Sequence, residues 1–448
     1  MTSTLSVQER RRAALDRLGV APPPPRPAER GRRRRDAGDR RGRGAPRGGL
    51  TGIATRRERR FAELEHRGAA RPAEVRPADA LGPPPGAWYG ILAVVVVFVM
   101  LGLVMVLSAS AITEANGGRW AYGVFVRQSM WAGFGLIGLV VAARVPHRTW
   151  RRLAVPGAAL GVVAMLLPLL PGIGGTINGA RAWVRVGGFS VQPSELLKLA
   201  VVVATAELLT RRRGALNHRR RTLVPLAAIA CVGGGLCLVQ GDLGSAIVLG
   251  AIVLSVAWIA GVPLVPLAAM AAGAGVLGMG FVVSSQSRLD RFTAFLDVDG
   301  NKDRLAWQIY QGYVSMASGG MGGSGIGGSK TKLGYLPYAH SDFIFAIIAD
   351  ELGMIGAAAV IVGFAVLVWF GVQVALAAPD RFGMLLAGGI AAWLGIQAIV
   401  NLGGVTGLLP VTGLTLPFFS AGGSSLFTSM VAVGLLLGVA RRAGTRVT

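Results

Sequence analysis

The chain has 448 residues, of which 52% are hydrophobic and only 15% are charged, and its mean hydropathy is +0.54. This composition excludes an ordinary soluble enzyme and is typical of proteins that cross a membrane several times. The formal net charge of +24 would suit a nucleic-acid partner, but its distribution does not. The positive charge lies in a basic N-terminal segment and in short blocks between apolar runs, which is how membrane topology is encoded. We therefore expect no nucleic-acid partner.

The N-terminal segment, residues 1–86, is rich in Arg, Pro, Gly and Ala and holds 21 arginines against ten acidic residues. A segment of this composition buries too little apolar surface to offset its ordering entropy, so we predict a mostly disordered cytoplasmic tail. Its positive charge would hold it at the anionic inner membrane surface, and binding of a partner is an alternative. Residues 443–448 are predicted to form a second, short cytoplasmic tail.

Ten apolar runs follow the basic segment, and each is close to the roughly 20 residues that cross the hydrocarbon core. They are residues 88–110, 125–144, 154–172, 193–210, 223–240, 243–261, 264–284, 342–370, 383–403 and 424–440. We predict an all-α polytopic membrane protein with about ten transmembrane helices within residues 87–442.

Blocks of arginine predict the orientation of these helices. The blocks are Arg144, Arg148, Arg151 and Arg152; Arg211 to Arg213 with Arg219 to Arg221; and Arg441, Arg442 and Arg446. Because cytoplasmic loops carry an excess of Lys and Arg, both termini are expected in the cytoplasm. The long segment 285–341, between the seventh and eighth runs, then lies on the outer side. Loops of this length are usually functional or disordered, and its aromatic and apolar residues favour an ordered, functional one.

Ionisable residues in or beside the apolar runs are costly there, so each is a functional candidate. Glu195 and Lys198 are three residues apart and share a helix face, either as a self-neutralising pair or as part of a site. Asp242 lies between two runs and either caps the following helix or serves a site. Asp350 and Glu351 are adjacent and point in different directions, so at least one is expected to meet a polar interior or a cation.

Two glycine-rich segments interrupt the C-terminal half. Gly319–Lys330 resembles a phosphate-binding loop only superficially, because it lacks the Gly-Lys-Ser/Thr ending and a preceding strand. Gly407–Ser425 is irregular backbone, which is tolerated at membrane depth only when it is buried in protein or lines a watery cavity. We predict that it forms one wall of a binding site. The two cysteines, Cys231 and Cys237, fit no metal or disulfide spacing and are predicted to fill the core.

Four sequence blocks occur in order along the membrane region: Asn178–Trp183 with Phe189–Lys198, Gln240–Gly244, Leu336–Gly353, and Pro410–Ser425. They are similar to the patterns NGARRW…FSxQPSExxK, QPDLG, LPEAHTDFIFAVIGEELG and PVTGxPLPFxSxGGSS of the shape, elongation, division and sporulation (SEDS) family. The chain departs from these patterns at Gly241, Tyr338, Asp350 and Thr415. The resemblance covers roughly residues 90–442, and the amino-acid sequences of the matching blocks favour the division branch of the family.

The resemblance implies a peptidoglycan glycosyltransferase that polymerises lipid II, an undecaprenyl-diphosphate-linked disaccharide peptide, at the outer face of the bacterial cytoplasmic membrane. It also implies a place at the division septum, a class B penicillin-binding protein transpeptidase as partner, and other divisome membrane proteins. A sugar hydroxyl would attack an anomeric carbon with inversion, so a carboxylate should take its proton. Cations or a divalent metal, Mg²⁺ or Mn²⁺, would hold the departing diphosphate.

The family's essential aspartate lies in the large outer loop, in a pattern like NPxxDPxGxGYQ. Aligned without gaps over Phe295–Gln308, this aspartate falls on Asn301, and an amide cannot act as a base. A two-residue slip places it on Asp303, which we predict as the catalytic residue, with Asp299 and Asp297 as alternates. The candidates for substrate binding are Arg181, Glu195, Lys198, Asp242, His340, Asp342, Ser420 and Ser424.

Two other functions compete with polymerisation. A flippase for lipid II would also carry charges near the membrane midplane, although it would not need a carboxylate on a long outer loop. A non-catalytic or elongation-type member of the family could scaffold a transpeptidase, and the out-of-register aspartate favours that alternative.

Overall fold

The computed structural model describes residues 85–177, 179–186, 189–304, 306–333, 336–337 and 339–443. All of these residues belong to one compact unit, residues 77–448. The two predicted cytoplasmic tails, 1–86 and 443–448, lie almost wholly outside the described residues.

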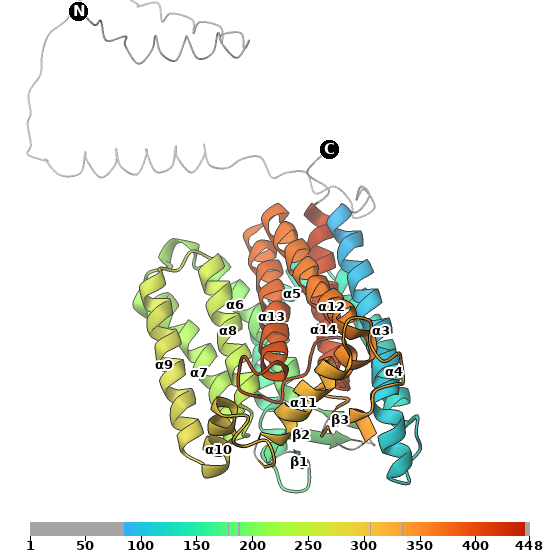
Figure 1. The fold of residues 1–448 in the computed structure, drawn as a ribbon. Coiled ribbons are helices and arrows are strands. Elements are labelled where there is room, and N and C mark those ends of the chain that lie inside the picture. The colour runs from blue at the N-terminus through green and yellow to red at the C-terminus, as the bar shows by residue number, and fades with distance from the viewer. Residues whose placement is uncertain are drawn as a thin grey trace, which may run out of the picture. The chain divides into compact units, whose positions relative to one another are not determined.

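Ten long helices make up most of the part of the chain that the structure describes (Figure 1). They are α3 (Gly86–Asn116), α4 (Gly123–Arg144), α5 (His147–Ala164), α6 (Pro193–Arg211), α7 (Val224–Val239), α8 (Leu243–Ile259), α9 (Leu264–Val283), α12 (Ile344–Ala377), α13 (Arg381–Val405) and α14 (Gly423–Ala443). By length and composition, eight spans among the described residues could cross a membrane. The two long helices that are not among these eight are α8, which has only 17 residues, and α6, which carries charged residues. Each predicted apolar run coincides with one of the ten helices, which confirms the predicted fold class.

Shorter elements connect these helices. α10 (Gln286–Leu296) and α11 (Trp307–Ser318) lie between α9 and α12, followed by the single turn η5 (Thr331–Leu333). The predicted long outer loop is therefore ordered in large part, with two helices of its own. The remaining turns are η2 (Leu167–Leu169), η3 (Arg213–Ala215) and η4 (Arg219–Leu223).

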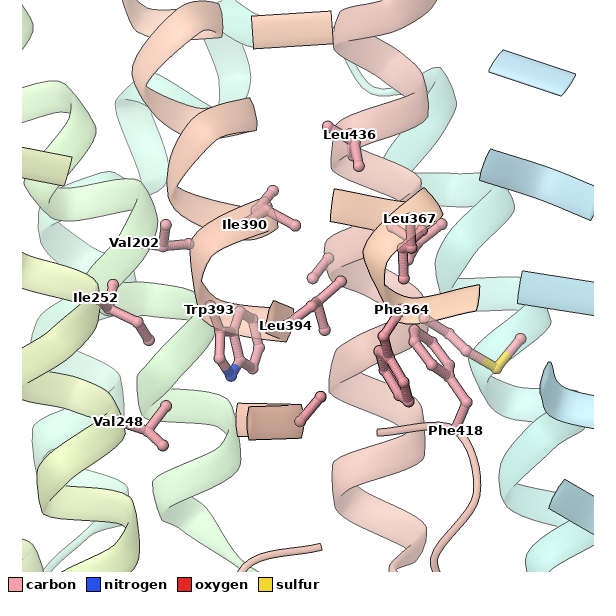
Figure 2. Close-up of a cluster of buried hydrophobic side chains, with 14 of the residues drawn as sticks. Val202, Val248, Ile252, Phe364, Leu367, Ile390, Trp393, Leu394, Phe418 and Leu436 are labelled. Carbon is pink, nitrogen blue, oxygen red and sulfur yellow. The ribbon is translucent and has the colours of Figure 1, made fainter. Parts of the chain in front are cut away.

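The core of the domain lies around α13 and α14. In α14, 89% of the most apolar stretch is buried against other parts of the chain, whereas the share in α9 is 11%. Figure 2 shows Trp393 and Leu394 of α13 among buried side chains from α6, α8, α12 and α14. Most of the apolar side chains of α9 are therefore not covered by other parts of the described chain.

A small antiparallel sheet joins α5 to α6, and the sequence analysis did not predict it. Its strands are β1 (Gly174–Ile177), β2 (Ala180–Val186) and β3 (Phe189–Val191), in the order β1-β2-β3. The register places Val184 of β2 opposite both Gly174 and Val191. The N–H of Arg181 donates to the carbonyl of Gln240 at 2.8 Å, which fastens β2 to the end of α7. We call the end of the domain that carries the sheet, α10 and α11 the sheet end (Figure 1).

α12 is interrupted at Gly353, where the backbone has φ 67° and ψ −170°. The glycine-rich residues 319–328 pack against this break, and the N–H of Ser324 donates to the carbonyl of Asp350 at 2.9 Å. A Cβ atom at Gly323 or at Gly353 would collide with the facing backbone. The glycines thus allow two backbone segments to approach closely, and the run serves as a packing element for α12.

The adjacent carboxylates of α12 meet different partners, as predicted. Asp350 accepts hydrogen bonds from four hydroxyls, those of Ser315, Ser324, Ser329 and Thr331. Glu351 pairs with Lys332 of η5 at 2.7 Å, and its two oxygens accept from the hydroxyl of Ser108 of α3 at 2.7 and 2.8 Å. Both carboxylates are buried, so the two residues fix the outer segment onto α12 and α3.

Candidate active site at the sheet end

A cavity of about 1960 Å³ lies at the sheet end and extends along α7, α8 and α9. Its lining also draws on α4, the sheet, α6, α10 and α11, and on the connecting residues 340–342, 410–415 and 421–423. Nine of the 19 residues in the predicted wall segment Gly407–Ser425 line this cavity.

The cavity has two chemically different parts. The first, which we call the apolar wall, is made by small and aliphatic side chains: Ala230, Gly234 and Leu238 of α7, Ala246, Gly250 and Leu254 of α8, and Met270, Ala274 and Leu277 of α9. The second, the polar wall, comprises Gln128, Gln192, Glu195, Asp242, Gln308, His340 and Asp342. A ligand that fills both parts must have an apolar portion and a polar headgroup.

Glu195 and Lys198 form a buried ion pair in the first turns of α6, as their spacing predicts. Lys198 Nζ lies 2.8 Å from Glu195 Oε1 and 3.0 Å from Gln397 Oε1. Lys198 is fully buried and does not border the cavity, whereas Glu195 does. Among the described residues, Glu195 Oε2 has no hydrogen-bond partner. A buried acceptor beside a cavity can accept a hydrogen bond from water or from a substrate hydroxyl.

Asp242 caps α8 and also borders the cavity. Its Oδ1 accepts from the N–H of Ser245 at 2.9 Å, as an N-cap residue should, and its Oδ2 accepts from Gln192 Nε2 at 2.9 Å. The predicted cap is confirmed, and capping leaves this carboxylate on the polar wall.

The turn that precedes α12 carries two titratable groups of the polar wall. Asn401 Nδ2 donates to the carbonyls of Asp342 and Leu414, at 2.9 and 2.7 Å, and the carbonyl of His340 accepts from the N–H of Ala421 at 2.8 Å. Burial lowers the pKa of His340 below its usual range and raises the pKa of Asp342 to about 6. The two groups therefore differ in charge near neutral pH, with the imidazole neutral and the carboxylate mostly ionised.

Ser420 and Ser424 support the wall and do not line the cavity. Ser420 Oγ accepts from the N–H of Leu416 at 2.8 Å, and its carbonyl accepts from Gln128 Nε2 at 2.9 Å. Ser424 Oγ accepts from the N–H of Gln192 at 3.2 Å. Both hydroxyls thus satisfy backbone groups that irregular structure leaves without helical partners.

The three carboxylates proposed for catalysis lie in the segment between α10 and α11. Asp297, Asp299 and Asp303 are all exposed, and none of them lines the cavity. Asp297 is held locally, because its Oδ1 accepts from the N–H of Gly300 at 3.0 Å. The helices on either side, α10 and α11, do contribute to the lining.

The arginines of the cavity are not those that the sequence analysis selected. Arg181 is exposed, donates to the carbonyl of Leu170 at 3.3 Å and does not line the cavity. Arg127 of α4 and Arg288 and Arg291 of α10 do line it. The i,i+3 spacing of Arg288 and Arg291, directly after the seventh apolar run, was the available signal for a cationic helix face.

The family resemblance also implied that a divalent cation could take part in the site. Within the described ranges, no three His, Cys, Asp or Glu side chains come together in a metal-binding group. Mg²⁺ often binds through one or two carboxylates together with phosphates, and Glu195, Asp242 and Asp342 are the carboxylates of the polar wall. The described side chains alone do not build a metal centre.

The fold defines a multi-pass membrane protein, and its cavity combines an apolar wall with a polar wall. The chain belongs to the FtsW/RodA/SpoVE family, described as cell cycle proteins, whose pattern matches residues 89–444. The predicted resemblance to this family is thereby confirmed.

Several curated proteins are similar to the chain over most of its length. It is 39% identical over 383 residues to the probable peptidoglycan glycosyltransferase FtsW of Mycobacterium tuberculosis, covering 85% of this chain and 72% of that protein. The FtsW protein of Trichlorobacter lovleyi, of the same description, is 39% identical over 353 residues, 78% of this chain and 92% of that protein. Stage V sporulation protein E of Bacillus subtilis is 37% identical over 357 residues, 78% of this chain and 96% of that protein.

Solved structures agree with this assignment. A structure described as "Structural coordination of polymerization and crosslinking by a peptidoglycan synthase complex" has a TM-score of 0.64 and 30% identity, over 79% of this chain and 98% of that chain. The crystal structure of the rod shape determining protein RodA of Thermus thermophilus has a TM-score of 0.56 and 30% identity, over 79% and 96%.

Proposed function

We propose that the chain polymerises lipid II on the outer side of the bacterial cytoplasmic membrane. The class of activity, peptidoglycan glycosyl transfer, follows from membership of the family and from the names of the similar proteins. The observation that carries the proposal is a cavity in which an apolar wall and a carboxylate-bearing polar wall meet. Lipid II needs both, because a polyprenyl tail and a sugar headgroup are joined in one molecule.

The reaction requires a base and a site for a departing anion. A hydroxyl oxygen of one headgroup bonds to the anomeric carbon of another, the bond from that carbon to the diphosphate oxygen breaks, and the configuration inverts. The hydroxyl proton passes to a carboxylate as the new bond forms. The polyprenyl diphosphate leaves with the bonding electrons, and cations stabilise its charge.

For the base we retain Asp303, with Asp299 and Asp297 as alternates. The segment that carries them joins α10 to α11, and Phe292 and Gln308 on these helices line the cavity. Loops that complete an active site often close only around the substrate. A modest inward movement of this exposed segment would bring a carboxylate to the headgroup.

The remaining candidates divide by position. We assign Glu195, Asp242, His340 and Asp342 to contact with the headgroup, because all four line the polar wall. Lys198, Ser420 and Ser424 act indirectly, since they hold the wall in place. Arg181 would reach the headgroup only after it releases the carbonyl of Leu170.

The orientation rests on the arginine blocks. The sheet joins the end of α5 to the start of α6, so the arginine-rich starts of α5 and ends of α6 lie at the opposite end of the domain. Cytoplasmic loops are the arginine-rich ones, which supports an outer position for the sheet end.

We further propose a class B penicillin-binding protein transpeptidase as partner, together with other divisome membrane proteins, at the division septum. A similar solved structure concerns a synthase complex that coordinates polymerisation with crosslinking, and crosslinking is the reaction of a transpeptidase.

The test uses the purified full chain in liposomes, with its transpeptidase partner and labelled lipid II. We expect glycan ladders from the unaltered chain and a loss of about a hundred- to ten-thousand-fold in rate for Asp303→Ala. Lys302→Ala, an exposed neighbour in the same segment, is the matched control and should retain the ladders. Normal ladders from Asp303→Ala would move the base to Asp299 or Asp297, or out of this segment.

The same assay separates the rival functions. Movement of lipid II across the vesicle membrane without ladders would indicate a flippase. Neither ladders nor movement would indicate a scaffold, which the exposed position of the three loop carboxylates favours.

A further inference from the structure

Two arginines lie on one face of α10, the helix that follows the C-terminal end of α9 at the sheet end (Figure 1). Arg288 and Arg291 are three residues apart, so their side chains project from the same side of the helix. Both line the cavity, and the end of α9 that adjoins them contributes Met279, Phe281 and Val282 to the same lining. The two cations therefore lie directly beyond the apolar lining that α9 contributes.

The guanidinium of Arg288 is held in place by the end of α9. Its Nη1 donates to the carbonyl of Phe281 at 3.1 Å and to the hydroxyl of Ser284 at 3.2 Å. Its Cζ lies 3.7 Å from the centre of the Phe281 ring, in a cation–π contact. These contacts use one of the nitrogens and leave other N–H groups for a ligand, in an orientation that is fixed before the ligand arrives.

Neither arginine is neutralised within the described part of the chain. No carboxylate oxygen there forms a salt bridge with Arg288 or Arg291. The nearest acidic residue in sequence, Asp290, instead accepts from Gln286 Nε2 at 2.8 Å. Two uncompensated guanidinium groups beside a cavity form a site for an anion with several oxygens.

We propose that Arg288 and Arg291 bind the diphosphate of a polyprenyl-diphosphate-linked sugar, an assignment that rests on the proposed function. The diphosphate of such a molecule lies between its tail and its sugar. With the tail along the apolar wall and the sugar at the polar wall, the diphosphate must lie at the border between them. Arg288 and Arg291 lie on α10, directly after the apolar lining that α9 contributes, and a planar guanidinium binds phosphate oxygens through paired hydrogen bonds.

This assignment replaces the cations that the sequence favoured. Lys198 is fully buried against Glu195 and Gln397, and Arg181 lies off the cavity lining. Arg127 also lines the cavity, but it comes from α4, whereas Arg288 and Arg291 share one helix.

The experiment measures binding and turnover separately, on the full chain in detergent. Geranylgeranyl diphosphate is the binding probe, and geranylgeraniol tests how much of the affinity belongs to the tail alone. We expect Arg288→Gln plus Arg291→Gln to weaken binding of the diphosphate probe by about ten- to a hundred-fold, because charge-assisted hydrogen bonds are lost. Geranylgeraniol should bind both proteins equally, and KM for lipid II should rise with the loss of probe binding.

The controls keep the outcomes distinct. Arg185→Gln removes an exposed arginine of β2 that does not line the cavity, and it should leave probe binding unchanged. Arg291→Gln alone tests the site if the double variant does not fold, because the side chain of Arg288 keeps its contacts with α9. Unchanged affinity for the diphosphate probe in these variants would overturn the assignment. An unaltered chain that binds the probe and makes no ladders would instead count against the proposed polymerase.

Discussion

The described part of the chain contains two buried Lys–Glu pairs that differ in how completely their charges are satisfied. In the first, Lys332 and Glu351 lie 2.7 Å apart, and the hydroxyl of Ser108 donates to both oxygens of the carboxylate. In the second, Lys198 binds one oxygen of Glu195, the other oxygen has no hydrogen-bond partner among the described residues, and Glu195 borders the cavity.

The difference separates a structural pair from a pair that serves a site. The first pair, Lys332 with Glu351, which we call the sealed pair, joins three segments far apart in the sequence: α3, η5 and α12. It does not line the cavity. The second pair, Glu195 with Lys198, which we call the open pair, places Glu195 on the polar wall, and Lys198 does not border the cavity. Buried charge alone therefore does not identify a functional residue, whereas an unsatisfied acceptor at a cavity is more informative.

The largest effect on stability is expected at the sealed pair. Lys332→Met leaves Glu351 as an unpaired charge in a dry environment, which should cost about 3–5 kcal/mol. Thermal unfolding and the yield of monodisperse protein in detergent measure this loss. The double variant Lys332→Met plus Glu351→Gln should recover most of it, and equal stability of the single and double variants would show that the pair is not buried as described.

A smaller effect is expected at the open pair, because Glu195 borders the cavity, whereas Lys332 and Glu351 do not. Lys198→Ala should reduce folded yield by more than Glu195→Ala plus Lys198→Ala does, but by less than Lys332→Met does. If Glu195 also contacts the headgroup, the double variant should be folded and poorly active in the ladder assay. Equal yields for the single and double variants would remove the distinction between the two pairs.

The smallest effect is expected at Asp342, a polar-wall carboxylate with no lysine or arginine paired to it in the described residues. Burial raises its pKa to about 6, so the folded state favours the proton. The associated stability is fully present below about pH 4 and is lost as pH rises through about 6. Asp342→Asn should therefore stabilise the protein at pH 7.5 by about 1–3 kcal/mol and leave it nearly unchanged at pH 4. Unfolding temperatures of both proteins at the two pH values measure this, and an equal shift at both would contradict it.

The helices of this fold could be predicted from sequence because a bilayer imposes both length and polarity on each span. The pairing of Glu195 with Lys198 was also accessible, since three residues along a helix bring two side chains together. Lys332 was not singled out, because it is 19 residues from its partner Glu351 and only the packing of the preceding glycine-rich run against α12 brings the two together.

The sheet, the cationic face of α10 and the position of Asp303 likewise depend on contacts between segments that are distant in the sequence. β1 and β3 have only four and three residues, which is too short for a recognisable pattern, and the seven residues of β2 pair with them only because the connection between α5 and α6 folds back on itself. Arg288 and Arg291 look like ordinary charged residues of a connecting segment until α9 and the cavity are placed beside them. Asp303 was selected by its place in a family pattern, and pattern alone cannot tell whether a side chain faces a cavity.

The central claim is that the cavity holds the lipid-linked substrate, and Cys231 offers the most direct test. The chain has two cysteines: Cys231 is exposed on the apolar wall of α7, and Cys237 is fully buried. The rate at which N-ethylmaleimide modifies Cys231 can be followed by mass spectrometry with increasing lipid II, using phosphatidylglycerol at the same concentration as control. We predict that lipid II slows the modification in a saturable manner and that phosphatidylglycerol does so far less. A modification rate that stays constant at saturating lipid II would contradict a substrate-binding role for the cavity.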